Sequence, residues 1–145
     1  MNSNPPDNSA DASDAEFEPL NASMLSASLT ASDIQVSLAW YRDVLGLTIA
    51  RAFEREGKLR AVSLRAGAVP ILLTQDDGAR GADRVKGEGI SLRLTTSQNI
   101  DELARRVREK GGTLESEPAD MMGVRAFRLR DPDGFKLLIS SEQRM

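Results

Sequence analysis

Small polar and cationic side chains that could bind a ligand recur at alternate positions in several short stretches of the chain. They are Ser26, Ser28, Thr30, Thr74, Ser91, Arg93 and Lys136. Hydroxyl groups and cations of this kind suit an anionic or carbonyl group, and arginine offers it a planar fork of donors. The chain contains no histidine and no cysteine. This excludes Ser-His triads, thiolate nucleophiles and most transition-metal sites, so the sequence designates no catalytic residue.

The first of these stretches lies in a region with one strand, one helix and three further strands. Residues 24–31 alternate polar and apolar side chains at period two, as a half-buried strand does. Asp33 is a suitable N-cap, and apolar residues then recur at helical spacing until Gly46. Strands are predicted over residues 47–55, 59–65 and 69–75.

The second half of the chain repeats this order. A strand is predicted from Gly89 to Leu94 and a helix, capped by Asn99, that ends at Gly111 and Gly112. Strands follow at 113–117, 124–130 and 134–140, the last two joined by a DPDG turn. The segment LRAVSLRAGAVPILLT at 59–74 aligns with VRAFRLRDPDGFKLLI at 124–139. Two copies of one βαβββ unit explain this alignment, with chance similarity as the alternative.

Charge divides the chain into a leader and a domain. Residues 1–23 hold five of the 22 acidic residues and none of the 19 basic ones, and we expect this segment to be a disordered acidic leader. The domain then covers 24–145 and is slightly basic. Aromatic residues make up 4%, and no long apolar run or secretion signal is present. We therefore expect a cytoplasmic protein that binds neither nucleic acid nor a membrane.

Two segments carry a family resemblance. ASDIQVSLAWYRDVLGLTI and RLRDPDGFKLLI resemble the helix opening and the closing hairpin of vicinal oxygen chelate proteins, the glyoxalase, bleomycin-resistance and extradiol dioxygenase superfamily. The resemblance spans residues 24–141. It implies an α+β fold of two βαβββ modules (24–75 and 88–141), whose curved mixed sheets enclose a cavity, and a homodimer.

The resemblance also implies where a metal would be bound. The family's metal-ligand positions fall on Ser26, Leu72, Gly89 and Leu138 of this chain. A divalent ion needs several anionic or basic ligands, which these side chains do not supply. We therefore expect no metal and no cofactor, which puts the family's metal-dependent activities in doubt.

Strand alternation assigns two faces to each sheet. Ala27, Leu29, Ile90, Leu92, Leu94, Leu137 and Ile139 are expected to face the helices. The opposite parity gives the predicted ligand-binding set, which Met121 joins from the loop before residue 124. That set is Ser26, Ser28, Thr30, Leu72, Thr74, Gly89, Ser91, Arg93, Met121, Lys136 and Leu138.

Each of these assignments has a simpler alternative. Arg93 could form an ion pair with a neighbouring carboxylate, and Lys136 could extend into water. The hydroxyl residues could be no more than small side chains on a crowded surface, and Met121 could fill the core.

Three functions fit these expectations. The first is a metal-free protein that binds a small organic ligand, anionic or carbonyl-bearing, as in the bleomycin-resistance branch. The second is a lyase or isomerase of the glyoxalase type with a non-standard metal site. The third is a scaffold that acts only through protein partners, with a cavity filled by its own side chains.

Overall fold

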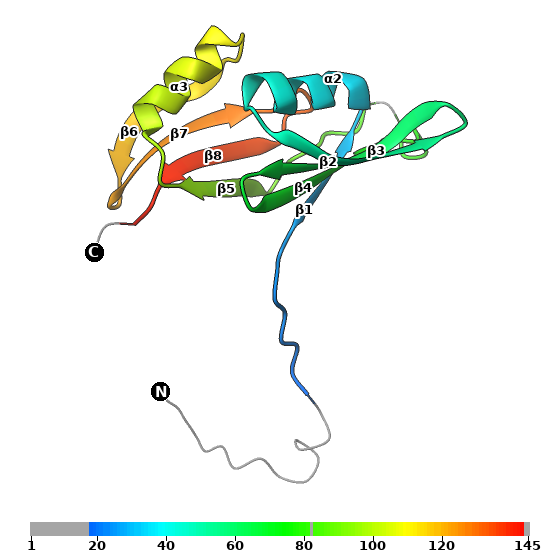
Figure 1. Cartoon of the computed structure of the whole chain (residues 1–145), viewed down its shortest axis with the longest axis horizontal. Helices are drawn as coiled ribbons and strands as arrows, with labels where there is room; N and C mark the ends of the chain where they lie inside the picture. The colour runs from blue at the N-terminus through cyan, green and yellow to red at the C-terminus, as the bar shows by residue number, and fades with distance from the viewer. Residues whose placement is uncertain (1–17, 82, 144–145) are drawn as a thin grey trace.

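The computed structural model describes residues 18–81 and 83–143, which form two sheets of four strands each. The first sheet has the order β1-β4-β3-β2, and the second has the order β5-β8-β7-β6. Each sheet belongs to one half of the chain and carries its own helix (Figure 1). This is the predicted pair of βαβββ modules.

The first module contains strands β1 (Ala27–Ala31), β2 (Thr48–Arg55), β3 (Lys58–Ala66) and β4 (Val69–Gln75). β1 pairs in parallel with β4, whereas β3 pairs antiparallel with both β4 and β2. Before β1, residues 18–26 run away from the sheets (Figure 1). Most of the predicted leader, residues 1–17, lies outside the described residues.

The second module repeats this plan with β5 (Ser91–Thr96), β6 (Leu114–Met121), β7 (Val124–Arg130) and β8 (Lys136–Ser141). β5 pairs in parallel with β8, and β7 lies antiparallel between β8 and β6. The two modules therefore share both strand order and strand direction.

Local signals in the sequence fix the helices. Helix α2 (Ile34–Ala39) begins after Asp33, whose side chain accepts a hydrogen bond from the Gln35 amide. It continues as a π-helical turn, η1 (Trp40–Val44), so the single helix predicted up to Gly46 is wider over its last turn. Helix α3 (Ile100–Glu109) begins after Asn99, which caps the Glu102 amide.

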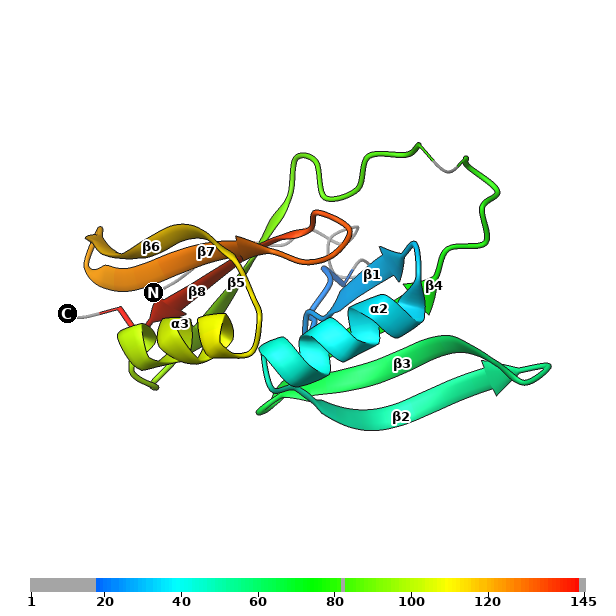
Figure 2. The same ribbon diagram turned by 90° about the horizontal axis from the view of Figure 1, so that it is seen from above.

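Each helix covers one face of its sheet. Both helices lie on the same side of the molecule in Figure 1, and they lie next to each other in Figure 2. The core beneath them includes Leu29, Leu73, Leu129 and Leu137, all buried. Among the described residues, no helix lies over the opposite face of either sheet. Within one chain the two sheets do not close around a cavity.

One predicted core residue is misplaced. Ile90 is 57% exposed, so its assignment to the helix-covered face is wrong. The physical reason is that the chain is still in a turn up to Gly89, and β5 starts only at Ser91. Strand alternation therefore does not apply to Ile90.

A buried polar cluster joins the two modules. The hydroxyl of Tyr41 donates to Asp131 Oδ2 at 2.7 Å, and the other oxygen of Asp131 accepts from the amides of Asp133 and Phe135. Burial raises the pKa of Asp131 above its ordinary value, and the hydrogen bonds that it accepts partly oppose this rise. Burial also raises the pKa of Tyr41, so the phenol stays protonated and remains a donor.

The segment between the modules adds a second set of contacts. The Lys86 ammonium lies 3.0 Å from an Asp76 oxygen and 3.6 Å from an Asp133 oxygen, and it donates to Ser32 Oγ at 2.8 Å. Asp133 also accepts from the backbone amide and the hydroxyl of Ser32. These bonds link the end of β1, the end of β4 and the β7–β8 turn, and so fix one module against the other. Of the helices in the described part of the chain, none is long and apolar enough to cross a membrane.

Candidate functional site

The helix-free face of the second sheet carries an ordered array of cations. Strand register places Arg93, Leu138 and Arg128 in one row across β5, β8 and β7. The next row contains Ser91, Lys136 and Arg130. Directly paired residues point to the same side of a sheet, so both rows share the face opposite to α3.

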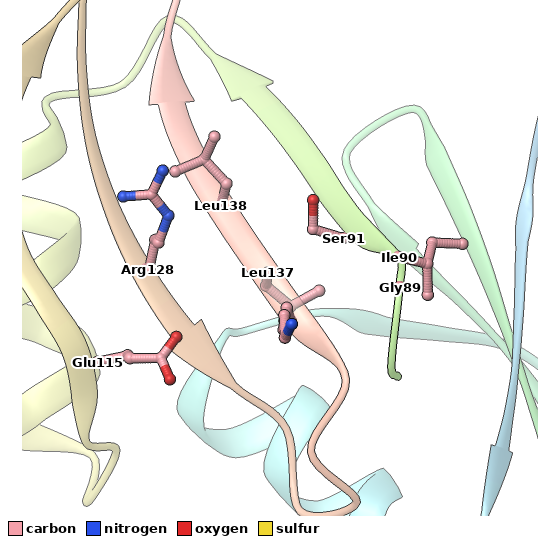
Figure 3. Close-up of a pocket in the computed structure, with 8 residues that line it drawn as sticks. Gly89, Ile90, Ser91, Glu115, Arg128, Leu137 and Leu138 are labelled. Atoms are coloured by element: carbon pink, nitrogen blue, oxygen red, sulfur yellow. The ribbon is translucent and has the colours of Figure 1, made fainter. Parts of the chain in front are cut away.

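A shallow hollow of about 310 Å3 opens on this face (Figure 3). Its floor is the start of β8, at Leu138 and the backbone of Leu137, whose side chain is buried in the core, and one wall is formed by Gly89, Ile90 and Ser91. Arg128, Glu115 and Lys136 also line the hollow. In Figure 3 the Arg128 side chain extends beside Leu138. The hollow therefore combines an apolar floor with cations at its border.

The cations on this face differ in their partners. Arg130 is paired with Glu115, with 2.5 Å between Nε and Oε2. Arg93 donates to the neutral hydroxyl of Ser140 at 3.2 Å. Within residues 18–81 and 83–143, no ion pair involves Arg93, Arg128 or Lys136. The ion pair considered for Arg93 from sequence is thus not formed in the described chain.

The first sheet presents a less charged face. Its rows are Ser28, Leu72, Ser63 and Arg51, followed by Thr30, Thr74, Ala61 and Phe53. Arg51 lies over the ring of Phe53, 4.9 Å from its centroid. Ser26 lies one residue before β1 and is exposed.

The predicted ligand-binding residues therefore divide into groups. Gly89, Ser91, Lys136 and Leu138 meet at the hollow, and Arg93 neighbours it. Five lie on or next to the first sheet, away from that hollow: Ser26, Ser28, Thr30, Leu72 and Thr74.

Met121 is the last residue of β6 and pairs with Val124. It was predicted in a loop, whereas the structure places it in a strand and restricts the turn to Met122 and Gly123. Met121 does not contribute to the hollow.

The residues at the expected metal positions do not fit a metal ion. Leu72 and Leu138 occupy equivalent places in the two modules. Leu72 on β4 pairs with Ser28 of the parallel strand β1, and Leu138 on β8 pairs with Arg93 of the parallel strand β5. Ser26 lies two residues before Ser28, and Ser91 lies two residues before Arg93. The register therefore makes Ser91, and not Gly89, the equivalent of Ser26, while Gly89 lies in the turn before β5. Hydroxyl and leucine side chains offer no anionic or imidazole ligand. The described residues contain no group of three or more Asp or Glu residues suited to a metal ion.

A second hollow, of about 670 Å3, lies beside the start of α3. Its cation, Arg125, is already held by Asp101 at 2.7 Å and Asp120 at 3.1 Å. The guanidinium lowers the pKa of Asp101 by hydrogen bonding, so this pair is charged at neutral pH. Because its charges are satisfied internally, this hollow is a weaker candidate than the first.

Comparison with known proteins identifies the family. The model of the glyoxalase/bleomycin resistance protein/dioxygenase superfamily matches residues 23–139. The chain belongs to this superfamily. It is 31% identical over 123 residues to a lactoylglutathione lyase of Salmonella typhimurium. The matched region covers 79% of this chain and 88% of that protein.

Solved structures share the fold. A glyoxalase/bleomycin resistance protein/dioxygenase from Nocardioides has a TM-score of 0.70 at 18% identity, covering 90% of this chain and 89% of its own. A lactoylglutathione lyase from Agrobacterium tumefaciens has a TM-score of 0.61 at 21% identity, covering 84% and 95%. These likenesses establish the architecture of two modules.

Sequence reasoning missed three residues of the site, Arg128, Arg130 and Glu115. The signal for the two arginines was present, because VRAFRLR alternates and Phe127 and Leu129 take the core parity. Arg128 and Arg130 must then point to the other face. No comparable signal existed for Glu115, because its position depends on a register shift between β6 and β7.

Proposed function

We propose that this protein binds a small organic ligand on the helix-free face of its second sheet, without a metal ion. The observation that carries the proposal is the hollow over Leu138, whose border carries the cations Arg128 and Lys136. Apolar surface with a few placed polar groups is the usual composition of a ligand pocket. Lys136 and Ser91, and Arg93 beside them, favour a ligand with an anionic or carbonyl group.

We further propose that a second copy of the chain completes the cavity in a cytoplasmic homodimer. The helix-free faces of both sheets lie on the same side of the molecule, opposite to the helices (Figure 1). On β2, Phe53 lies in a row of this helix-free face and is 40% exposed, an apolar contribution suited to an interface. Ser28, Thr30, Leu72 and Thr74 of one copy would then meet the hollow of the other.

The proposal is tested with a neutral apolar probe, Nile red, added to protein dialysed against EDTA. We expect its fluorescence to increase on binding, and Leu138→Trp to reduce the affinity at least tenfold because the indole fills the hollow. The matched control is Val36→Trp on α2, at a position that is 53% exposed and far from this face. Absence of binding to the wild type, or equal binding by both variants, would contradict the proposal.

A second candidate function is a lyase or isomerase of the glyoxalase type. The identity to the Salmonella lactoylglutathione lyase favours it. It would require a metal ion held by residues outside the four expected positions. Assay of the full chain with the hemithioacetal of methylglyoxal and glutathione, with added Ni2+ or Zn2+, decides this alternative: turnover supports it, and its absence removes it.

A further inference from the structure

We propose that Arg93 and Arg128 form a two-armed anion site across Leu138, and that the ligand is an organic anion with an apolar body. A carboxylate, sulfonate or phosphonate group would be held between the two guanidinium groups. This inference rests on the proposed function and specifies the class of ligand.

Strand register supplies the geometry. Arg93 and Arg128 both pair with Leu138, one from each side. With strands about 4.8 Å apart, their Cα atoms are separated by about 10 Å. An extended arginine side chain spans more than half of that gap, so both planar forks can reach one anionic group above Leu138.

Within the described chain, Arg93 and Arg128 have no carboxylate counter-ion. Glu115 is the carboxylate that lines the hollow, and it is already bound to Arg130. Arg93 has a neutral partner, Ser140, and Arg128 is exposed. Unpaired like charges on one face repel one another, and an anionic ligand would relieve that repulsion.

In the proposed dimer, the first sheet of a second copy would face the hollow, and its central rows offer no negative charge to Arg93 and Arg128. The two central rows of the first sheet contain hydroxyl, apolar and cationic side chains and no carboxylate. Within the described residues, closing that face over the hollow would bring no carboxylate from these two rows to the two arginines. An anionic group on the ligand would supply the counter-ion that these rows lack.

The surroundings define the remainder of that ligand. Leu138 is half-buried between the two arginines, and Ile90 is 57% exposed at the border of the hollow. Bare inorganic anions would leave this apolar surface in contact with water. An anion attached to a ring or alkyl chain covers it, which adds the hydrophobic contribution to the ionic one.

The test compares two probes on the full chain, 8-anilinonaphthalene-1-sulfonate, which is anionic and apolar, and Nile red, which is neutral. We expect Arg93→Gln and Arg128→Gln each to weaken binding of the sulfonate about tenfold or more, because each loses a charge-assisted hydrogen bond. Nile red affinity should change less than twofold. Arg93→Lys and Arg128→Lys keep the charge without the fork and should fall between the wild type and the glutamine variants.

Arg106→Gln is the matched control, since Arg106 is exposed on α3, on the other side of the sheet. It should bind both probes as the wild type does, and thermal melts should show all variants folded. Sulfonate affinity that is unchanged in the Arg93 and Arg128 variants would overturn the two-armed site, while Nile red binding would leave the proposed function standing. Failure of the wild type to bind Nile red would overturn the proposed function itself.

Discussion

Replacing Tyr41 by phenylalanine tests how strongly the two modules are joined. The tyrosine ring is fully buried and packs edge-on against Trp40, with ring centroids 4.9 Å apart. Phenylalanine keeps that packing and removes only the hydroxyl that donates to Asp131. Asp131 is 6% exposed, so water replaces the lost donor poorly.

The expected cost follows from this geometry. A hydrogen bond to a buried charged group contributes about 1.5–3 kcal/mol. For a domain of this size each kcal/mol lowers the melting temperature by about 3–5 °C, which gives a decrease of about 5–15 °C. Urea unfolding followed by circular dichroism at pH 7 measures the change in the free energy of unfolding.

Ser37→Ala provides the comparison. The Ser37 hydroxyl lies 3.4 Å from Asp133, a long and weak hydrogen bond, so its loss should cost less than about 1 kcal/mol. If Tyr41→Phe costs less than about 0.5 kcal/mol, the Tyr41–Asp131 bond does not stabilise the module junction and the reasoning fails.

Three further predictions concern other parts of the same framework. The first is Asp131→Asn: burial raises the pKa of the wild-type Asp131 carboxyl in the folded state above its ordinary value of 3.8. The wild type should therefore gain stability relative to the variant as pH falls through the raised pKa towards 3.8. Unfolding curves between pH 7 and 3 measure this, and a gain with rising pH would contradict it. The second is Gly87→Ala, which should lower the free energy of unfolding by more than about 2 kcal/mol, since a Cβ would lie 2.8 Å from the Phe135 Cα at a φ of +79°. Gly78→Ala, with a similar φ and open space around the Cβ, should lower it by about 1 kcal/mol. Equal melting temperatures of the two variants would refute the close approach at Gly87. The third is Glu115→Gln, which should change the free energy of unfolding by less than about 1 kcal/mol, because both partners of the Glu115–Arg130 ion pair are roughly half exposed. The variant frees Arg130 and should therefore bind 8-anilinonaphthalene-1-sulfonate more tightly. A decrease in that affinity would count against the anion site.

The fold could be predicted from sequence because each module carries its own local signals twice. Asp33 and Asn99 cap the two helices as expected, and β4 and β7 have the predicted bounds, 69–75 and 124–130. β6 runs to Met121, beyond the predicted end at 117. Pro118 is tolerated there because β6 is an edge strand with a register shift between Ser116 and Ala119.

The site was only partly predictable, because its parts depend on contacts between distant segments. Alternation correctly grouped Ser91, Lys136 and Leu138, since each lies inside a strand with a clear period. It misplaced Ile90, where the strand had not yet begun. The Tyr41–Asp131 bond joins residues 90 positions apart, and neither residue has a local pattern that reveals the other.

The π-helical turn at Trp40–Val44 was also outside the reach of sequence reasoning. The apolar spacing of Ile34, Leu38, Tyr41 and Leu45 suits an ordinary helix equally well. The wider turn is visible in the bond from the Leu45 amide to the Trp40 carbonyl, which joins residues five positions apart.

The most direct test of a metal-free ligand site is a titration of 8-anilinonaphthalene-1-sulfonate into the full chain after dialysis against EDTA, repeated after addition of Zn2+ or Ni2+. We expect the EDTA-treated protein to bind the probe, with a dissociation constant that changes less than twofold when either metal is restored. Binding that appears only with the metal present would contradict the account and would favour a metal-dependent lyase.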